Sequence, residues 1–109
     1  MQLNTVASRH FGVIWDTFFI YVLGMPNEMD SESQNYYSQY FKMSAKLLPC
    51  KKCRDYFVNV LMTKYPIDLT SRERAFASVY IWKSIVNKKL GKPNDSFKKV
   101  IDYYNSFIV

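Results

Sequence analysis

The sequence predicts an all-α fold, a bundle of five helices joined by short links. Apolar residues recur at spacings of three and four along most of the chain, which is the periodicity of an amphipathic helix. No stretch alternates apolar and polar residues for long enough to indicate a strand, and glycines and prolines divide the pattern into segments. With 109 residues, 49% of them hydrophobic and 17% aromatic, the chain can build one core. We therefore expect a single domain over residues 1–109.

The first predicted helix carries apolar residues at spacings of four, three and four: Phe11, Trp15, Phe18 and Val22. Asn4 or Thr5 would cap its start, and Gly24 with Pro26 would end it. In the second predicted helix, six residues lie on one face: Tyr37, Tyr40, Phe41, Ser44, Leu47 and Leu48. Pro49 would end this helix. A third helix would begin at the cysteines and run through Phe57, Val60 and Leu61 to the sequence KYP.

Thr70 or Ser71 would open the fourth helix, in which five residues form a buried stripe: Ala75, Val79, Trp82, Val86 and Leu90. Gly91 suits the position just after the helix, and Pro93 lies shortly beyond it. The last helix would lie within residues 95–107, with Phe97, Val100, Ile101 and Tyr104 on one face.

The net charge of +6 is spread along the chain, with higher density only around residues 42–54 and 83–99. A continuous Lys/Arg run is missing, which counts against a nucleic-acid-binding module, although charge and aromatic content keep this alternative open. The most apolar stretch, FGVIWDTFFIYVLG, is interrupted by Asp16 and is too short to span a membrane. We expect neither a membrane span nor a signal peptide.

The two cysteines of the sequence lie in LLPCKKCRDYF, residues 47–57. Two cysteines do not make a disulfide scaffold, and a structural zinc site usually takes four Cys or His ligands. The single histidine, His10, is forty residues away. We therefore predict no metal site.

Cysteines at positions i and i+3 of a helix lie on the same side and can form a disulfide when the first is at the helix start. Pro49 favours that position for Cys50, where free backbone N–H groups stabilise a thiolate. We expect a nucleophilic, partly exposed Cys50 and a more enclosed Cys53. A structural or accidental pair remains the alternative. A helix precedes the motif, which disagrees with a thioredoxin fold. The natural electron acceptor would be an organic cofactor.

Four stretches, IWDTFF, LLPCKKCRDYF, LTSRERAF and VNKKLGKP, resemble in this order the FAD-dependent sulfhydryl oxidases of the Erv/ALR type, in the compact form of large DNA viruses. The resemblance covers roughly residues 10–93. It implies a four-helix bundle with a short fifth helix, FAD held between helices, and usually a homodimer. It also implies an infected-cell cytoplasm or virion as the place of action.

By this resemblance, Cys50 accepts electrons from a partner protein's dithiol, Cys53 lies next to the flavin, and oxygen is reduced to hydrogen peroxide. Substrate would reach Cys50 directly or through a small redox carrier protein. The resemblance also implies the cofactor-binding residues: Trp15, Phe19, Phe57, Lys83, Val86, Asn87, Lys89 and Lys92.

Several positions depart from the pattern of these oxidases. Lys83-Ser84 replaces a His-Asn pair, Phe19 replaces a histidine, and Gly12 replaces a basic residue. Tyr80 takes the place of one cysteine of a second disulfide, and no cysteine follows Leu90. A relative without flavin, acting as a helical scaffold or a dithiol carrier, is therefore the alternative hypothesis.

Overall fold

The computed structural model describes the backbone of residues 3–107 and the side chains of residues 12–107. Its helical segments are α1 (Leu3–Leu23), α2 (Ser31–Lys46), α3 (Lys51–Tyr56), the π-helical η1 (Phe57–Leu61), α4 (Met62–Lys64), α5 (Arg72–Lys89) and α6 (Phe97–Asn105). Because α3, η1 and α4 follow one another without a break, they form one continuous helix. The described residues contain no strand, only an isolated bridge between Glu28 and Ser71.

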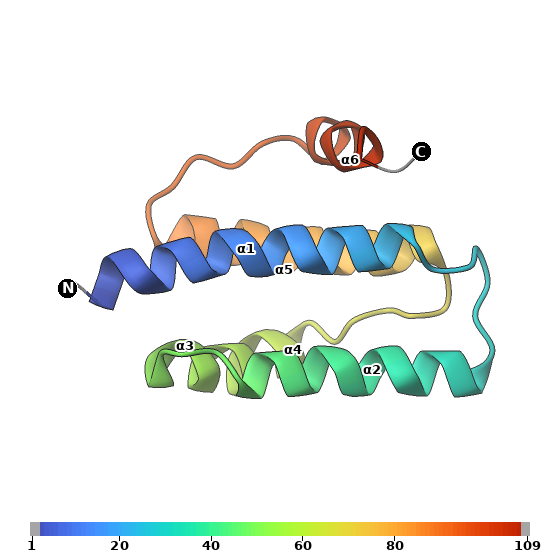
Figure 1. Ribbon diagram of the computed structural model, residues 1–109, viewed down its shortest axis with the longest axis horizontal. Helices are drawn as coiled ribbons and strands as arrows, with labels where there is room; N and C mark the ends of the chain where they lie inside the picture. Colours follow the sequence, from blue (N-terminus) through green and yellow to red (C-terminus); the bar gives the residue numbers. More distant parts are fainter. Residues whose placement is uncertain (1–2, 108–109) are drawn as a thin grey trace.

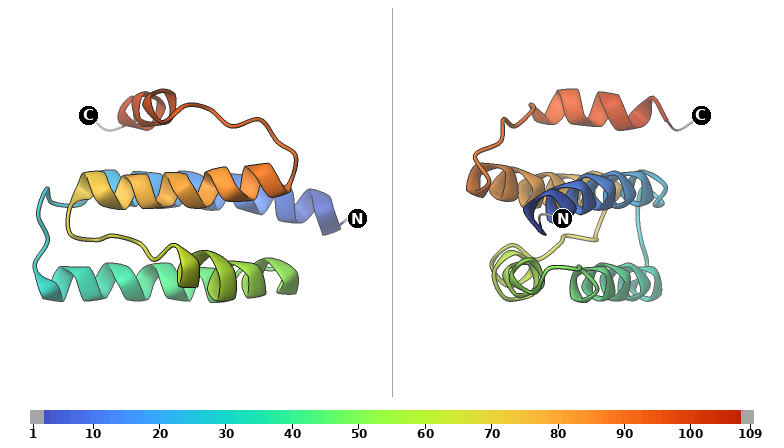
Figure 2. Two further views of the ribbon diagram at one scale, coloured as in Figure 1. Left: turned by 180° about the vertical axis from the view of Figure 1, so that it is seen from behind. Right: turned by 60° about the vertical axis from the view of Figure 1, so that its left-hand side comes forward.

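The helices form two layers with the short α6 outside them (Figure 1). One layer consists of α1 and α5, and the other of α2 and the continuous α3–α4 helix. Figure 2 shows the same two layers from two further directions, with α6 crossing the outer side of the α1–α5 layer. The predicted all-α fold, a four-helix bundle with a short fifth helix, is confirmed. Among the described helices, none is both long and apolar enough to cross a membrane.

Polar side chains cap three of the helix starts. Asp30, Ser71 and Ser96 each accept a hydrogen bond from the backbone N–H three residues later, at 2.7, 3.2 and 3.2 Å. After α5, Gly91 adopts a φ of 68°, a left-handed conformation that glycine reaches at little cost. The predicted start of α5 at Ser71 and its end before Gly91 are therefore confirmed.

The predicted start of the first helix is wrong. Helix α1 is already formed at Leu3, so the backbone of Asn4 and Thr5 lies inside the helix and not at its N-cap. The side chains of Asn4, Thr5, His10 and Phe11 lie outside the described residues.

The centre of the bundle holds one aromatic ring from each long helix. Phe18 of α1 lies 4.9 Å from Phe41 of α2, 6.2 Å from Phe57 of η1 and 6.5 Å from Trp82 of α5, centroid to centroid. All four side chains are at most 1% exposed. The Trp82 indole also donates a hydrogen bond of 2.7 Å to the Tyr65 carbonyl oxygen, so its polar group is satisfied in the core.

Leu90, predicted in the buried stripe of the fourth helix, and Leu47, predicted on one face of the second helix, are exposed. Leu47 is 74% exposed and Leu90 is 50% exposed. Each is the residue that ends its helix, at the C-cap of α2 and of α5, where the helical repeat no longer sets the side-chain direction. The predicted residues Phe41, Leu48, Ala75, Val79, Trp82 and Val86 are buried, as are Ala45 and Phe76, whereas Tyr37, Tyr40 and Ser44 are half-buried.

Candidate active site

Cys50 is the capping residue at the start of α3. Its backbone is extended, with φ −101° and ψ 124°, and its Sγ accepts a hydrogen bond of 3.4 Å from the Cys53 backbone N–H. Both cysteines are free thiols in this structure. The predicted position of Cys50 at the helix start is confirmed, and the N-terminal end of α3 is available to stabilise its thiolate.

The two thiols have opposite acidities. Hydrogen bonds from the Cys53 thiol and backbone N–H, and secondarily from the Lys52 N–H, lower the pKa of Cys50 from its ordinary value, and the nearby Arg54 charge acts in the same direction. Burial, together with the hydrogen bond and the charge of Cys50, raises the pKa of Cys53 to about 11. Cys53 packs against the hydrophobic core. Of the two, Cys50 is therefore the thiol that ionises first.

The basic residues around the cysteines have different contacts. Arg54 donates a hydrogen bond of 2.7 Å from Nη1 to the Leu48 carbonyl oxygen, which joins α3 to the end of the preceding segment. Lys51 forms an ion pair of 2.9 Å with Asp55 on the solvent side of the helix. The Arg54 side chain therefore both fixes the turn that carries Cys50 and places its charge near that thiol.

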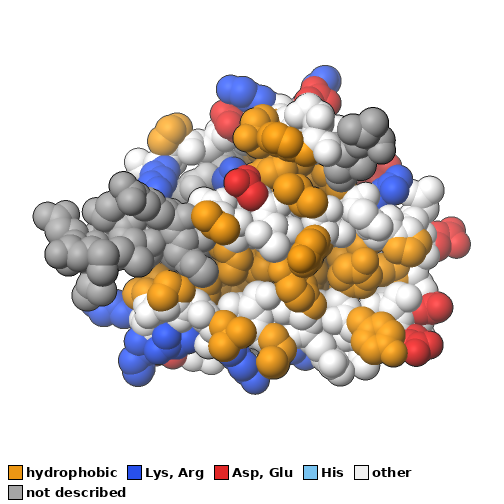
Figure 3. Space-filling model, viewed as in Figure 1, with side chains coloured by type: hydrophobic (Ala, Val, Ile, Leu, Met, Phe, Trp, Pro, Cys, Tyr) orange, Lys and Arg blue, Asp and Glu red, His pale blue; other side chains and the backbone are white. Residues whose placement is uncertain are grey.

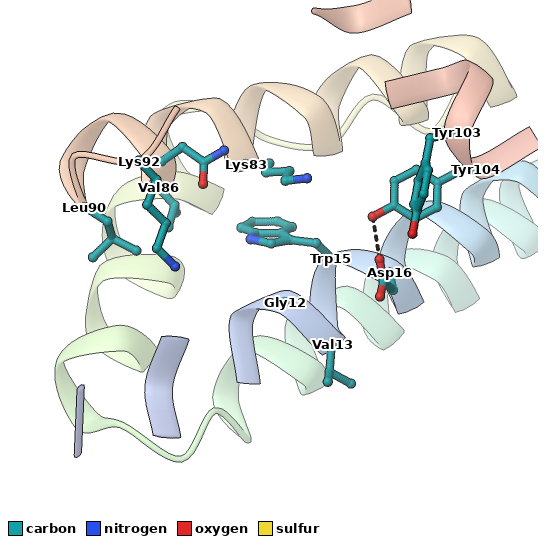
Figure 4. Close-up of a pocket in the computed structure, with 11 residues that line it drawn as sticks. Gly12, Val13, Trp15, Asp16, Lys83, Val86, Leu90, Lys92, Tyr103 and Tyr104 are labelled. Atoms are coloured by element: carbon teal, nitrogen blue, oxygen red, sulfur yellow. Dashed lines mark hydrogen bonds between the residues drawn. The ribbon is translucent and has the colours of Figure 1, made fainter. Parts of the chain in front are cut away.

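A cavity of about 680 Å³ lies beside α1, between α5 and α6 (Figure 4). Its lining comes from α1, from α5 and the segment after it, and from α6: Gly12, Val13, Trp15, Asp16, Lys83, Val86, Asn87, Leu90, Lys92, Tyr103 and Tyr104. Among the described residues, two lysines and one carboxylate line it, and this carboxylate, Asp16, accepts a hydrogen bond of 2.6 Å from the Tyr104 hydroxyl. The cavity thus combines an aromatic ring and apolar side chains with two ammonium groups.

The cavity brings together five of the eight residues predicted to bind a cofactor: Trp15, Lys83, Val86, Asn87 and Lys92. Phe57 lies behind this lining, its ring 5.9 Å from that of Trp15. Phe19 is fully buried and stacks on Tyr104, with a centroid distance of 4.7 Å and an interplanar angle of 26°. It thereby supports one wall of the cavity from inside the core.

The third predicted residue outside the lining is Lys89. Its Nζ lies 3.5 Å from the centroid of the Tyr56 ring, one helical turn beyond Cys53. The Lys89 charge also slightly lowers the pKa of Cys53. The structure therefore places Lys89 beside the cysteines, whereas Lys83 and Lys92 face the cavity.

Neither cysteine is among the residues that line the cavity. The two parts of the site are connected through the core, because Phe57 follows Cys53 by one turn and contacts Trp15 in the cavity wall. The end of α5 connects them a second time through Lys89 and Tyr56. The thiols and the cavity are thus neighbouring features on the same end of the bundle.

Hydrogen bonds hold the segment after α5 against the helix. The Asn94 side chain donates to the Ser84 hydroxyl at 2.9 Å and accepts from the Asn87 amide at 3.0 Å. The Tyr80 hydroxyl donates to the Asp95 carbonyl oxygen at 2.7 Å. At Tyr80, where the resemblance implies a cysteine, this chain therefore attaches the segment through hydrogen bonds.

Asp16 and α6 line the cavity, although the sequence pattern did not predict this. The four stretches that resemble known oxidases end before α6, so no motif indicated that Tyr103 or Tyr104 lines a site. A carboxylate that interrupts an apolar helix is the one visible indication for Asp16. No group of three or more His, Cys, Asp or Glu in the described part of the chain could hold a metal ion.

The fold and the site define an all-α protein that pairs a dithiol at a helix start with an aromatic and cationic cavity. A sequence model of the Erv1/Alr family matches residues 13–105, most of the chain. The chain belongs to the Erv1/Alr family, whose members are in general FAD-linked sulfhydryl oxidases, and this supports an oxidoreductase activity. A search of curated proteins finds no significant match.

Proposed function

We propose that the protein is an FAD-dependent thiol oxidase that forms disulfides in partner proteins through Cys50 and Cys53. The observation that carries the proposal is the capping position of Cys50, whose thiol accepts a hydrogen bond from the Cys53 backbone N–H beside the cavity. In the overall reaction, two substrate thiols and one oxygen molecule give one substrate disulfide and one hydrogen peroxide.

The lining of the cavity is suitable for FAD. A volume of about 680 Å³ is in the range of cofactor sites, and Trp15 with Val86 offers flat and apolar contacts for a ring system. Lys83 and Lys92 offer ammonium groups to the pyrophosphate, with Asn87 as a hydrogen-bonding partner. The chemistry that FAD supplies when bound is the acceptance of two electrons from a dithiol and their delivery to oxygen.

The two cysteines would exchange disulfides with the substrate in two steps. A substrate thiolate attacks the Cys50 sulfur of the Cys50–Cys53 disulfide, which forms a mixed disulfide and releases the Cys53 thiolate. The second substrate thiolate then attacks the substrate sulfur, which completes the substrate disulfide and releases Cys50. One substrate proton passes to the released Cys53 thiolate, whose pKa is raised to about 11, and the other passes to solvent. The lowered pKa of Cys50 favours this release, because a more acidic thiol is a better leaving group.

A dithiol carrier without a cofactor is the second candidate. It is favoured by one observation, that neither cysteine lines the cavity. A carrier would exchange disulfides with its partners in the same two steps but would consume no oxygen.

An absorbance spectrum of the purified protein separates the two candidates. We expect flavin bands at close to one FAD per chain, and oxygen consumption when a dithiol is added. Colourless, folded protein that does not take up added FAD would instead identify the carrier.

We expect Cys50→Ser and Cys53→Ser each to abolish oxygen consumption, and activity retained in either variant would contradict the roles given to these thiols.

We also propose a homodimer in which α1 and α2 form the contact. A groove of about 440 Å³ on these helices is lined largely by aromatic side chains: Ile20, Tyr21, Gly24, Tyr36, Tyr37 and Tyr40. Tyr21 and Tyr36 are 49% and 61% exposed, and covering them would remove apolar surface from water. Sedimentation tests this: we expect the wild type to be a dimer and Tyr36→Glu to be a monomer. A wild-type monomer would contradict the proposal.

A further inference from the structure

The surface around Cys50 combines exposed apolar and basic side chains. Met43 is 59% exposed and Leu47 is 74% exposed, and they lie one helical turn apart at the end of α2. Leu47 precedes Cys50 by three residues, so these apolar groups lie on the chain that leads directly to the thiol. Large apolar side chains at this exposure lose contact with water only when another molecule covers them.

The charge around this apolar pair is predominantly positive. Four exposed lysines accompany the apolar pair: Lys42, Lys46, Lys51 and Lys52. The sequence has no Asp or Glu between Glu32 and Asp55, and Asp55 is paired with Lys51. Among the described residues, no ion pair involves Lys42, Lys46 or Lys52. We call these six residues, the four lysines with Met43 and Leu47, the α2–α3 surface.

Figure 3 shows this surface along the lower left edge of the molecule, where basic side chains gather over α3 and the end of α2, with hydrophobic side chains between them. A substrate thiol has to come within bonding distance of the Cys50 sulfur. Leu47, Lys51 and Lys52 lie within three residues of Cys50, so a chain that brings its thiol to Cys50 passes close to the α2–α3 surface.

A substrate segment crossing this surface meets several positive charges without a neutralising carboxylate. Acidic residues beside the substrate cysteine would be attracted, and basic ones would be repelled, which gives selectivity. Met43 and Leu47 would bury apolar area against the same segment, and the flexible methionine can adapt to partners of different shape.

We propose that the α2–α3 surface docks substrate proteins through segments in which acidic residues and one large apolar side chain flank the cysteines. This rests on the proposed function in one respect, that the docked segment is the dithiol substrate. The substrate class is therefore a protein segment that is acidic and carries two cysteines.

The test measures binding without chemistry. Fluorescent peptides carry a Ser-x-x-Ser core in place of the substrate cysteines, flanked by acidic or by basic residues, and their Kd values are determined by fluorescence anisotropy. We expect the acidic peptide to bind about tenfold more tightly than the basic one, which is the effect of a few exposed charge pairs. This preference should shrink as salt is added, since salt screens exposed charges.

Lys46→Glu should weaken binding of the acidic peptide by about fivefold, and Lys42→Glu/Lys46→Glu should weaken it further. Lys64→Glu is the matched control, because Lys46 and Lys64 are both exposed lysines in the last turn of a helix. Lys64 lies at the far end of the continuous α3–α4 helix, about 20 Å from its start. Leu47→Ser should weaken binding only of those acidic peptides that also carry one large apolar side chain beside the Ser-x-x-Ser core.

Equal Kd values for acidic and basic peptides would overturn the proposal. Loss of affinity in Lys64→Glu equal to that in Lys46→Glu would also overturn it, as would tighter binding of a single-stranded oligonucleotide or an anionic vesicle than of the acidic peptide. Because the peptides contain no thiol, the result does not depend on oxidase activity. If FAD does not bind and the acidic preference holds, the surface serves the dithiol carrier instead.

Discussion

Cys50 and Cys53 are only two residues apart, yet their surroundings shift their acidities in opposite directions. Cys50 caps the helix and receives hydrogen bonds, whereas Cys53 is half-buried against the core and next to the other sulfur. One thiol is therefore suited to exchange with molecules arriving from solvent. In the proposed reaction, Cys53 is the thiol that would pass electrons inward.

The difference predicts which thiol is alkylated first. Since the thiolate is the nucleophile, the lowered pKa of Cys50 gives it more reactive thiolate at pH 7, whereas Cys53 becomes reactive only as the pH approaches about 11. Iodoacetamide labelling across a pH series, followed by peptide mass spectrometry, should find Cys50 modified first at every pH below that range. Earlier labelling of Cys53 would contradict this order.

Lys89 is expected to influence the cysteines rather than a ligand in the cavity. Its charge lowers the pKa of Cys53, so Lys89→Met should raise that pKa and slow the alkylation of Cys53 at high pH. Lys89→Arg keeps the positive charge and should restore the wild-type profile. Lys88→Met, which removes the neighbouring exposed charge, is the control, and an equal effect there would exclude a specific role for Lys89.

At the scale of elements, α6 depends on a small number of contacts. It has nine residues, too few for a stable isolated helix, so packing has to hold it. Tyr104 supplies much of that packing, through its ring on Phe19 and its hydroxyl on Asp16. Because Tyr104 also lines the cavity, the attachment of α6 sets the shape of one cavity wall.

Tyr104→Phe removes this hydroxyl and leaves the ring. We expect a loss of about 1 kcal/mol in the free energy of unfolding. The loss stays this small because the acceptor, the Asp16 carboxylate, is exposed and can bind water instead. Tyr103→Phe is a matched control from the adjacent residue, whose side chain is 55% exposed, and should change stability little. Urea denaturation of both variants measures the difference, and equal effects would show that the Tyr104 hydrogen bond is unimportant.

The helices could be predicted because their apolar repeat is a local property, whereas several details depend on tertiary structure. Leu47 and Leu90 fit the repeat but lie at helix ends, where it no longer applies. The π-helical turn at Phe57–Leu61 was not predicted, since one extra residue in a turn does not disturb the apolar pattern visibly.

The site was predicted unevenly for the same reason. Cys50 and Cys53 could be predicted as candidates because their chemistry follows from a short motif and a helix start. Residues on a helix far from the motif were harder to assign, since which face of α5 meets the cavity depends on how α1 and α6 pack. Lys83 and Lys89 both belong to α5, yet one faces the cavity and the other lies over Tyr56.

At the scale of the molecule, stability depends on the four central rings. Phe18 contacts rings from the other three long helices and is fully buried. Phe18→Ala should therefore reduce the free energy of unfolding by about 3–5 kcal/mol, a large part of what a domain of this size has. Ile81→Ala, at a side chain that is 44% exposed, should cost far less. Chemical denaturation tests both, and a small effect at Phe18 would contradict the central role of these rings.

The two tryptophans occupy places that make the protein its own fluorescent reporter. Trp82 is sealed among the central rings, whereas Trp15 forms part of the cavity wall, and the sequence has no others. A molecule that enters the cavity should quench the emission of Trp15 while the fold stays intact. Exposure of Trp82 to water should shift its emission to longer wavelength only when the bundle opens. With one tryptophan replaced by phenylalanine at a time, occupancy of the cavity and unfolding of the chain can be followed separately, without an added dye.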